Sequence, residues 1–226
     1  MVHGDVAGEF ARLAVELHEA PCVADTAERA LSFAVSAVGC DYAGLALTER
    51  GGLTEVGAST DPEIDRLRRW EIEAGGGPLR DSVAHGSAVL VQDVSAEGGA
   101  SDWSQHAVEA GVGSEMHVPM TSHEQVVGVL SLYSAKPHAF SIDDEAIAQV
   151  LAQHVSVAVA TARRDETMAQ AIDSRKLVGQ AMGILMERFD LDSDQAFAVL
   201  RRYSQDTNTK LREVAQQLID TRELPR

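Results

Sequence analysis

The sequence predicts an α+β protein in two parts. An antiparallel-sheet sandwich with flanking helices comes first, followed by a long linker helix and an all-α three-helix bundle. Three observations predict this arrangement. Five short runs with strand character lie between residues 42 and 133, with helix-like segments before, between and after them. No proline or glycine occurs between Pro137 and Gly179, and residues 173–221 contain three segments with helical apolar periodicity.

Two helices and a hairpin open the chain. Residues 5–19 and 25–38 place apolar side chains at helical spacing. Residues 42–48 and 53–59 are typical of strands, and the Arg50-Gly51-Gly52 segment between them predicts a hairpin with a glycine turn.

The middle of the chain completes the predicted sheet. Asp61 as N-cap and Pro62 at the first helical position predict a helix through Glu73. The glycine-rich segment 75–78 predicts a mobile loop and is no phosphate loop, because no GK[ST] follows and no strand precedes it. Residues 98–101 predict another flexible loop. The remaining predicted elements are strands over 88–92, 114–120 and 125–133 and a short helix over 102–110.

The linker helix begins with a cap formed by Ser141 and Asp144. Two interpretations stay open for its length: one unbroken helix from Ile142 towards Phe189, or a bend near residues 163–167. In either case we expect a homodimer in which the linker helices pair in parallel. The apolar stripe that motivates this pairing consists of Ile147, Leu151, Val155, Ala158 and Ala162.

Each of the three C-terminal segments has an apolar stripe that the others would have to cover. Asp192 is a good N-cap for the second segment, with Gln195 completing a capping box. Asn208 or Thr209 is the predicted cap of the third segment. A compact bundle follows, because no single helix can bury its own stripe.

The first segment of the bundle carries two glycines on one helical face. Gly179 and Gly183 are four residues apart, and together they cost the helix roughly 2 kcal/mol relative to alanine. Their spacing leaves backbone bare where another molecule or helix could approach. The face is therefore either a groove for a neighbouring helix or a contact with nucleic acid.

The charge of the chain is unevenly distributed. Of 19 basic and 35 acidic residues, nine of each fall in residues 171–226, so residues 1–170 carry the whole net charge of −16. An acidic body repels polyphosphates, which excludes broad non-specific nucleic-acid binding. Any RNA contact must therefore be local to the C-terminal bundle.

Several classes of function lack support in the sequence. The two cysteines, Cys22 and Cys40, form no CxxC motif, and no metal-ligand spacing, G-x-S-x-G or HExxH motif occurs. We expect no enzymatic activity, no metal and no cofactor. No apolar run approaches the ~20 residues that span a bilayer, and no secretory signal is present, so we expect a cytoplasmic protein.

The bundle resembles the ANTAR domain, a family of RNA-binding transcription antitermination regulators. The residues that carry the resemblance are Arg175, Gln180 to Met186, Asp194 to Phe197, Leu200 to Ser204, Asn208, Lys210-Leu211 and Val214-Ala215. Met182 departs from the pattern, since many members have a basic residue there. The resemblance implies that residues 166–226 recognise hairpin loops in mRNA leaders. The expected RNA-binding residues are Arg175, Lys176, Gly179, Gln180, Gly183, Arg201, Arg202, Asn208 and Lys210.

Residues 1–165 resemble a GAF domain. The residues that carry this resemblance are Ser114 to Met120, Val127 to Leu132, Phe140-Ser141 and Asp143 to Glu145. It implies a domain that senses a small molecule, light, gas or redox state, or that dimerises. If a ligand pocket exists, it should lie between the sheet and residues 75–78 and 98–103, with Trp103 and His117 as candidate pocket residues.

Three functions compete at this point. The first is an RNA-binding antiterminator controlled by a sensor domain. The second is a signalling or dimerisation module whose bundle docks on a protein partner, and the third is a sensor enzyme. A shared exposed face of Arg175, Lys176, Gln180, Arg201, Arg202 and Lys210 would favour the first, whereas an exposed apolar patch would favour the second.

Overall fold

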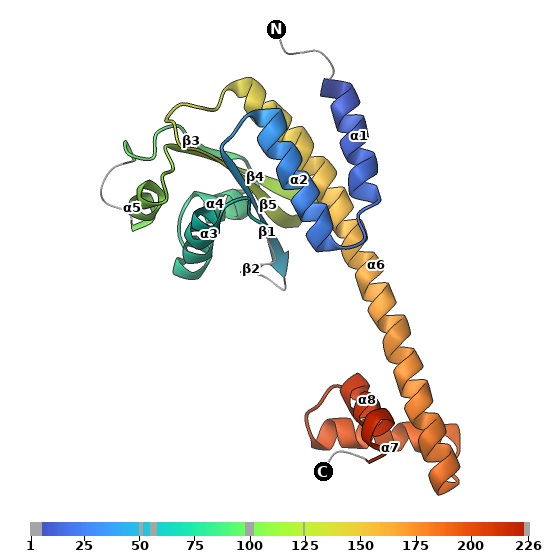
Figure 1. Ribbon diagram of the computed structural model, residues 1–226. Helices are drawn as coiled ribbons and strands as arrows, with labels where there is room; N and C mark the ends of the chain where they lie inside the picture. The colour runs from blue at the N-terminus through green and yellow to red at the C-terminus, as the bar shows by residue number, and fades with distance from the viewer. Residues whose placement is uncertain (1–5, 50–51, 55–57, 98–101, 124, 224–226) are drawn as a thin grey trace. The chain divides into compact units, whose positions relative to one another are not determined.

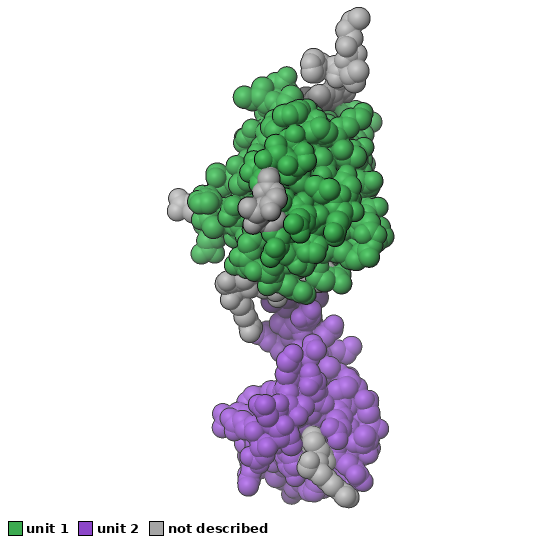
Figure 2. All heavy atoms as spheres, turned by 90° about the vertical axis from the view of Figure 1, so that its left-hand side faces the viewer, with its two compact units in different colours: residues 1–163 green, residues 164–226 purple. Residues whose placement is uncertain are grey.

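The computed structural model describes residues 6–49, 52–54, 58–97, 102–123 and 125–223. The predicted turn at Arg50 and Gly51 and the predicted loop at residues 98–101 lie outside the described residues. The chain divides into two compact units, Met1–Arg163 and Arg164–Arg226, which Figure 2 shows in different colours. None of the described helices is long and apolar enough to cross a membrane.

Unit 1 is built on one antiparallel sheet of five strands in the order β2-β1-β5-β4-β3. The sheet confirms the predicted α+β class (Figure 1). The strands are β1 (Tyr42–Glu49), β2 (Gly52–Thr54), β3 (Val89–Val91), β4 (Ser114–Ser122) and β5 (Gln125–Ser134). Of the strand predicted over residues 53–59, positions 53 and 54 belong to β2, Ser59 forms an isolated bridge to Gly44, and residues 55–57 lie outside the described residues.

Helices cover both faces of this sheet (Figure 1). On one face, α1 (Val6–His18), α2 (Val23–Val38) and the first part of α6 (Ile142–Phe189) enclose the larger core. On the other face lie α3 (Pro62–Ala74), α4 (Pro78–His85) and α5 (Asp102–Glu109). Side chains alternate along each strand, so Met116 and Val118 of β4 enter the larger core while His117 faces the other side.

The linker helix is continuous in the structure. α6 is one helix from Ile142 to Phe189, the first of the two lengths that the sequence left open. Its predicted start is confirmed, because the backbone N–H of Ser141 donates to Asp144 Oδ2 at 2.8 Å.

The predicted pairing stripe on α6 has a different role. Leu151 and Val155 are completely buried in the larger core of unit 1, and Ala158 packs against it. The sequence interpretation of these residues as a dimer face is therefore wrong, because periodicity identifies a buried face but does not reveal what covers it.

Unit 2 is a three-helix bundle made of the C-terminal part of α6, α7 (Ser193–Asp206) and α8 (Leu211–Thr221). Its core consists of Ala181, Leu185, Ala196, Leu200, Val214, Ala215 and Leu218. The predicted capping box of α7 is confirmed, with Asp192 Oδ1 accepting from the Gln195 backbone N–H at 2.8 Å. The predicted cap of α8 is wrong: Lys210 is the N-cap residue and makes no side-chain cap bond, while Asn208 adopts a left-handed φ of 51°.

Candidate functional site

An outward face of α6 in unit 2 carries five of the predicted RNA-binding residues. Ala181 and Leu185 are completely buried on the core side of the helix. With 3.6 residues per turn, the predicted residues fall on the opposite side, where all are exposed. We call this group the α6 set: Arg175, Lys176, Gly179, Gln180 and Gly183.

The two glycines of the α6 set are not required by packing inside the chain. A Cβ atom added at Gly179 or Gly183 would meet nothing within 4 Å. The described part of the chain therefore places no neighbouring helix against them, and an intramolecular groove does not explain them. A helix that accepts the propensity cost of two glycines without using the space leaves that space to another molecule.

The other four predicted residues lie on α7 and at the start of α8. Arg201 and Arg202 are exposed on the side of α7 opposite the buried Ala196 and Leu200. Arg202 Nε lies 3.5 Å from Asp206 Oδ2, but both side chains are largely exposed, so the pair is weak and salt-screened. Asn208 and Lys210 are also exposed, and the four residues form the α7–α8 set.

The two sets lie on different elements of the bundle. The three helices surround a shared core, and each set lies on the outward side of its own helix.

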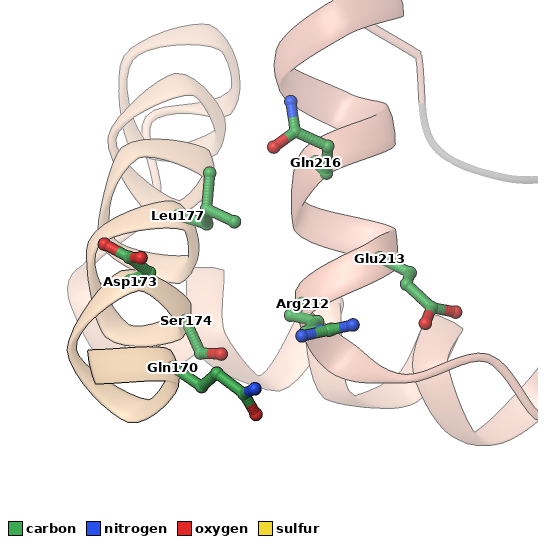
Figure 3. Close-up of a pocket in the computed structure, with 7 residues that line it drawn as sticks. All are labelled: Gln170, Asp173, Ser174, Leu177, Arg212, Glu213 and Gln216. Atoms are coloured by element: carbon green, nitrogen blue, oxygen red, sulfur yellow. The ribbon is translucent and has the colours of Figure 1, made fainter. Parts of the chain in front are cut away.

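A groove that the sequence did not predict lies between α6 and α8 (Figure 3). Its volume is about 300 Å³, and Arg212 is the basic residue among those that line it. Ser174 and Leu177 form the α6 wall and Gln216 belongs to α8. The α6 set does not contribute to its lining.

Unit 1 contains a cavity of about 640 Å³, within the range of small-molecule sites. Trp70 of α3, Trp103 of α5 and the edge strand β3 line it, together with Gly76, Gly77 and Pro78. These residues lie where the sequence placed a pocket. Trp103 is among the lining residues, whereas His117 is not.

His117 instead belongs to a buried polar cluster between the sheet and α3, composed of Arg68, Glu71, Glu115, His117 and Tyr133. Its Nε2 lies 2.9 Å from Glu115 Oε1 and its Nδ1 lies 2.9 Å from Ser131 Oγ. The ring also packs edge-on against Tyr133, with the centroids 5.7 Å apart. The hydrogen bonds of both ring nitrogens are therefore satisfied inside the protein.

Two glycines make room for this cluster. A Cβ at Gly44 of β1 would lie 2.7 Å from Cδ of Arg68, and a Cβ at Gly77 would collide with the carboxyl group of Glu71. Glu71 Oε1 accepts a hydrogen bond from the Leu79 N–H at 2.7 Å, which ties α3 to the first turn of α4. Glu71 Oε2 and Glu115 Oε2 have no hydrogen-bond partner among the described residues.

Burial and neighbouring charges set the protonation of this cluster. Burial, reinforced by Glu115, raises the pKa of Glu71 to about 8. Burial alone would lower the pKa of His117, but the charge and hydrogen bond of Glu115, with the charge of Glu71, raise it. At neutral pH a pKa of about 8 keeps Glu71 mostly protonated, and Glu115 stabilises the charged form of His117.

The sequence contains a signal for this cluster. Glu115 and His117 stand two residues apart in β4, on either side of the apolar Met116, so they share one face of the strand. Arg68 and Glu71 are three residues apart on α3 and also share a face. The cysteines take no part, and burial raises the pKa of the Cys40 thiol to about 11.

Both units match known protein families. Residues 23–160 match the GAF domain and residues 166–219 match the ANTAR domain. The chain belongs to the GAF family, and it carries a C-terminal ANTAR domain. An ANTAR domain implies RNA-binding antitermination, and a GAF domain is a sensor domain. The comparison with functionally curated proteins gave no match.

Solved structures support the fold of unit 1. A GAF domain of the phosphoenolpyruvate-protein phosphotransferase from Coxiella burnetii is 16% identical, with a TM-score of 0.55 over 71% of this chain and 95% of that chain. The corresponding Acinetobacter domain is also 16% identical, with a TM-score of 0.52 over 70% and 93%. A free methionine-R-sulfoxide reductase from Neisseria meningitidis is 18% identical, with a TM-score of 0.52 over 69% and 88%. At these identities the likeness concerns the fold, so the enzymatic activity of one neighbour does not transfer.

Proposed function

We propose that this protein is a transcription antitermination regulator that binds hairpin loops in nascent mRNA leaders under control of its GAF domain. The observation that carries the proposal is the pair of exposed glycines, Gly179 and Gly183, whose bare surface serves no packing inside the chain. Arg175 and Gln180 stand beside them as hydrogen-bond donors. Sequence-specific RNA recognition uses unpaired loop bases, which such a surface can approach closely.

The two sets of residues contact different parts of the RNA. The α6 set contacts loop bases or riboses at the bare backbone, and the α7–α8 set holds phosphates through Arg201, Arg202 and Lys210. Each set is exposed on the bundle surface, and we propose that two bundles engage two hairpins rather than one bundle a single stem.

A homodimer supplies the second bundle. Val150 and Val157 of α6 are 48% and 57% exposed, on the side of the helix away from the buried Leu151 and Val155. Their spacing of seven residues is that of a coiled-coil seam. We place the dimer contact on this exposed side of α6, in place of the buried stripe that the sequence suggested.

A direct binding experiment tests the RNA proposal. The full chain is titrated with a paired-hairpin RNA, with the same RNA carrying scrambled loops, and with an unpaired strand of equal length. We expect tight binding to the paired hairpins and at least about tenfold weaker binding to the other two. Equal affinity for all three RNAs would reduce the interaction to non-specific electrostatics.

Docking on a protein partner is a second candidate function, and one observation supports it. Unit 2 exposes Met186, Phe189 and Phe197 at 37%, 55% and 39%, and exposed apolar side chains of this size suit protein docking. Replacing Phe189 by serine separates the two functions. An unchanged hairpin affinity together with loss of a protein partner would favour the docking module.

A further inference from the structure

We propose that the cavity of the GAF unit binds a small organic cation, a molecule with a substituted ammonium group. This inference rests on the proposed sensor function of the domain and specifies the class of ligand. The cavity brings together aromatic faces, carboxylates and an apolar strand edge in a volume of about 640 Å³.

Both tryptophans of the chain line this one cavity. Trp70 comes from α3 and Trp103 from the first turn of α5. The ring of His106 packs against Trp70 with centroids 4.2 Å apart, which fixes the orientation of that indole. Tryptophan is the aromatic side chain that attracts cations most strongly.

The charges of the lining favour a cation over an anion. Asp81, Glu97 and Asp102 line the cavity, and no lysine or arginine is among the described residues that do so. These carboxylates are exposed, so they lie where a ligand would enter, and Trp103 lies deeper, with 7% of its surface exposed.

The first turns of α4 and α5 at the cavity could instead attract an anion, and their effect has to be weighed. Each helix N-terminus carries a partial charge of about +0.5, so the two contribute roughly +1 against three carboxylates. At α4, Pro78 has no N–H and the Leu79 N–H already donates to Glu71. The carboxylates at the cavity therefore outnumber the positive partial charges of the two helix ends.

One unsatisfied polar atom belongs to a residue of this cavity. Trp103 lines the cavity, and its buried Nε1 has no hydrogen-bond partner among the described residues. Buried polar atoms of native proteins are usually paired. The indole N–H can only donate, so a ligand that pairs with it carries an acceptor, such as a hydroxyl oxygen, besides its ammonium group.

The fluorescence of the two tryptophans provides the test, because the chain has no others. The full chain is titrated with choline and with tetramethylammonium, and in parallel with 3,3-dimethyl-1-butanol, a neutral molecule of the same shape as choline. We expect a saturable change in fluorescence with both cations and at least about tenfold weaker binding of the neutral analogue. An equal affinity for the neutral analogue, or no saturable response to either cation, overturns the proposal.

Variants of the lining residues provide a second arm. Asp81→Asn and Asp102→Asn should each weaken choline binding several-fold, and Trp103→Leu should abolish it while Trp70 still reports. Asp143→Asn changes an exposed carboxylate outside the cavity and should have no effect. If Trp103→Leu does not fold, Asp81→Asn and Asp102→Asn still test the proposal. Unchanged choline affinity in both of these variants contradicts it.

Hairpin affinity measured with and without choline distinguishes this inference from the proposed function. Choline binding that leaves hairpin affinity unchanged supports the cation site and contradicts control of RNA binding by this ligand. Loss of choline binding in the asparagine variants with intact hairpin binding supports the site as well. If the chain binds hairpins but its fluorescence does not change with either cation, the cation site is contradicted and the proposed RNA-binding function is not.

Discussion

His117 Nε2 lies 2.9 Å from Glu115 Oε1, and neither side chain has any exposed surface. The two residues are neighbours on one face of β4, and Glu71 of α3 reaches the same cluster. An ion pair in such a place is weak evidence for stability, because two charges lose their hydration. It does, however, make the stability of unit 1 depend on pH.

The first prediction concerns this pH dependence. The pKa of Glu71 is raised from 4.5 to about 8, so its contribution to stability is fully present below pH 4.5 and is lost as pH rises towards 8. The pKa of His117 is also raised, from 6.5, and its contribution is lost as pH rises through the folded-state value. We expect the free energy of unfolding of unit 1 to fall by roughly 2 kcal/mol or more between pH 5 and 9.

A pair of glutamine variants checks this assignment by urea unfolding at several pH values. Glu71→Gln keeps an acceptor for the Leu79 N–H and removes the titrating group, so the decline with pH should become shallower. Glu73→Gln, at an exposed position of the same helix, should leave the decline unchanged. A Glu71→Gln profile as steep as that of the parent would show that the cluster does not control the pH dependence.

The second prediction concerns the capping box of α7. Asp192→Ala removes the acceptor of the Gln195 N–H, which lies 2.8 Å away, and should lower the stability of unit 2 by about 1 kcal/mol. Asp192→Ser retains an acceptor and should restore most of the loss. Thermal unfolding followed by circular dichroism measures both, and an unchanged Asp192→Ala would mean that the cap is not needed.

The third prediction locates the dimer contact. Val157→Asp places a charge on the exposed side of α6 and should convert a dimer into a monomer at micromolar concentration. Val108→Asp makes the same substitution at a valine of α5 that is 53% exposed, and should leave the dimer intact. Sedimentation velocity distinguishes the two. A parent chain that sediments as a monomer would refute the proposed seam.

The fourth prediction separates phosphate contacts from base contacts. Arg202 is largely exposed and its pair with Asp206 is weak, so its guanidinium is available to phosphate. Arg202→Ala should weaken binding to every hairpin alike and reduce the slope of log K against log salt by about 1. Arg212→Ala removes the same charge from the α6–α8 groove and should leave that slope unchanged. Equal effects of both variants would mean that net charge alone matters.

The fold could be predicted largely from the sequence because its signals are local. Glycine, proline and capping residues such as Asp61, Ser141 and Asp192 mark element boundaries, and the structure confirms these caps. The helix α4 was not predicted because its N-cap, Gly77, has no side chain to mark the start, whereas α5, of the same length, begins with Asp102. The cap predicted at Asn208 or Thr209 failed because the chain enters α8 through a left-handed turn at Asn208.

The environment of the candidate residues could not be predicted in the same way. Leu151 and Val155 have the periodicity of a buried face, but the same pattern suits a core and a dimer. His117 and Glu115 are neighbours on one strand face and can be paired from the sequence, whereas Arg68 and Glu71 come from a helix remote in the sequence. Packing of elements remote in sequence decides these contacts.

The affinity of Gly183→Leu for paired-hairpin RNA tests the central claim most directly. The added side chain meets nothing inside the chain and replaces a poor helix former, so unit 2 should be no less stable than the parent. Gln217→Leu places the same leucine at an exposed position of α8 outside both sets and serves as the control. We predict that Gly183→Leu folds and loses hairpin binding while Gln217→Leu binds like the parent. A folded Gly183→Leu with the parent's affinity would contradict the assignment of the α6 face to RNA.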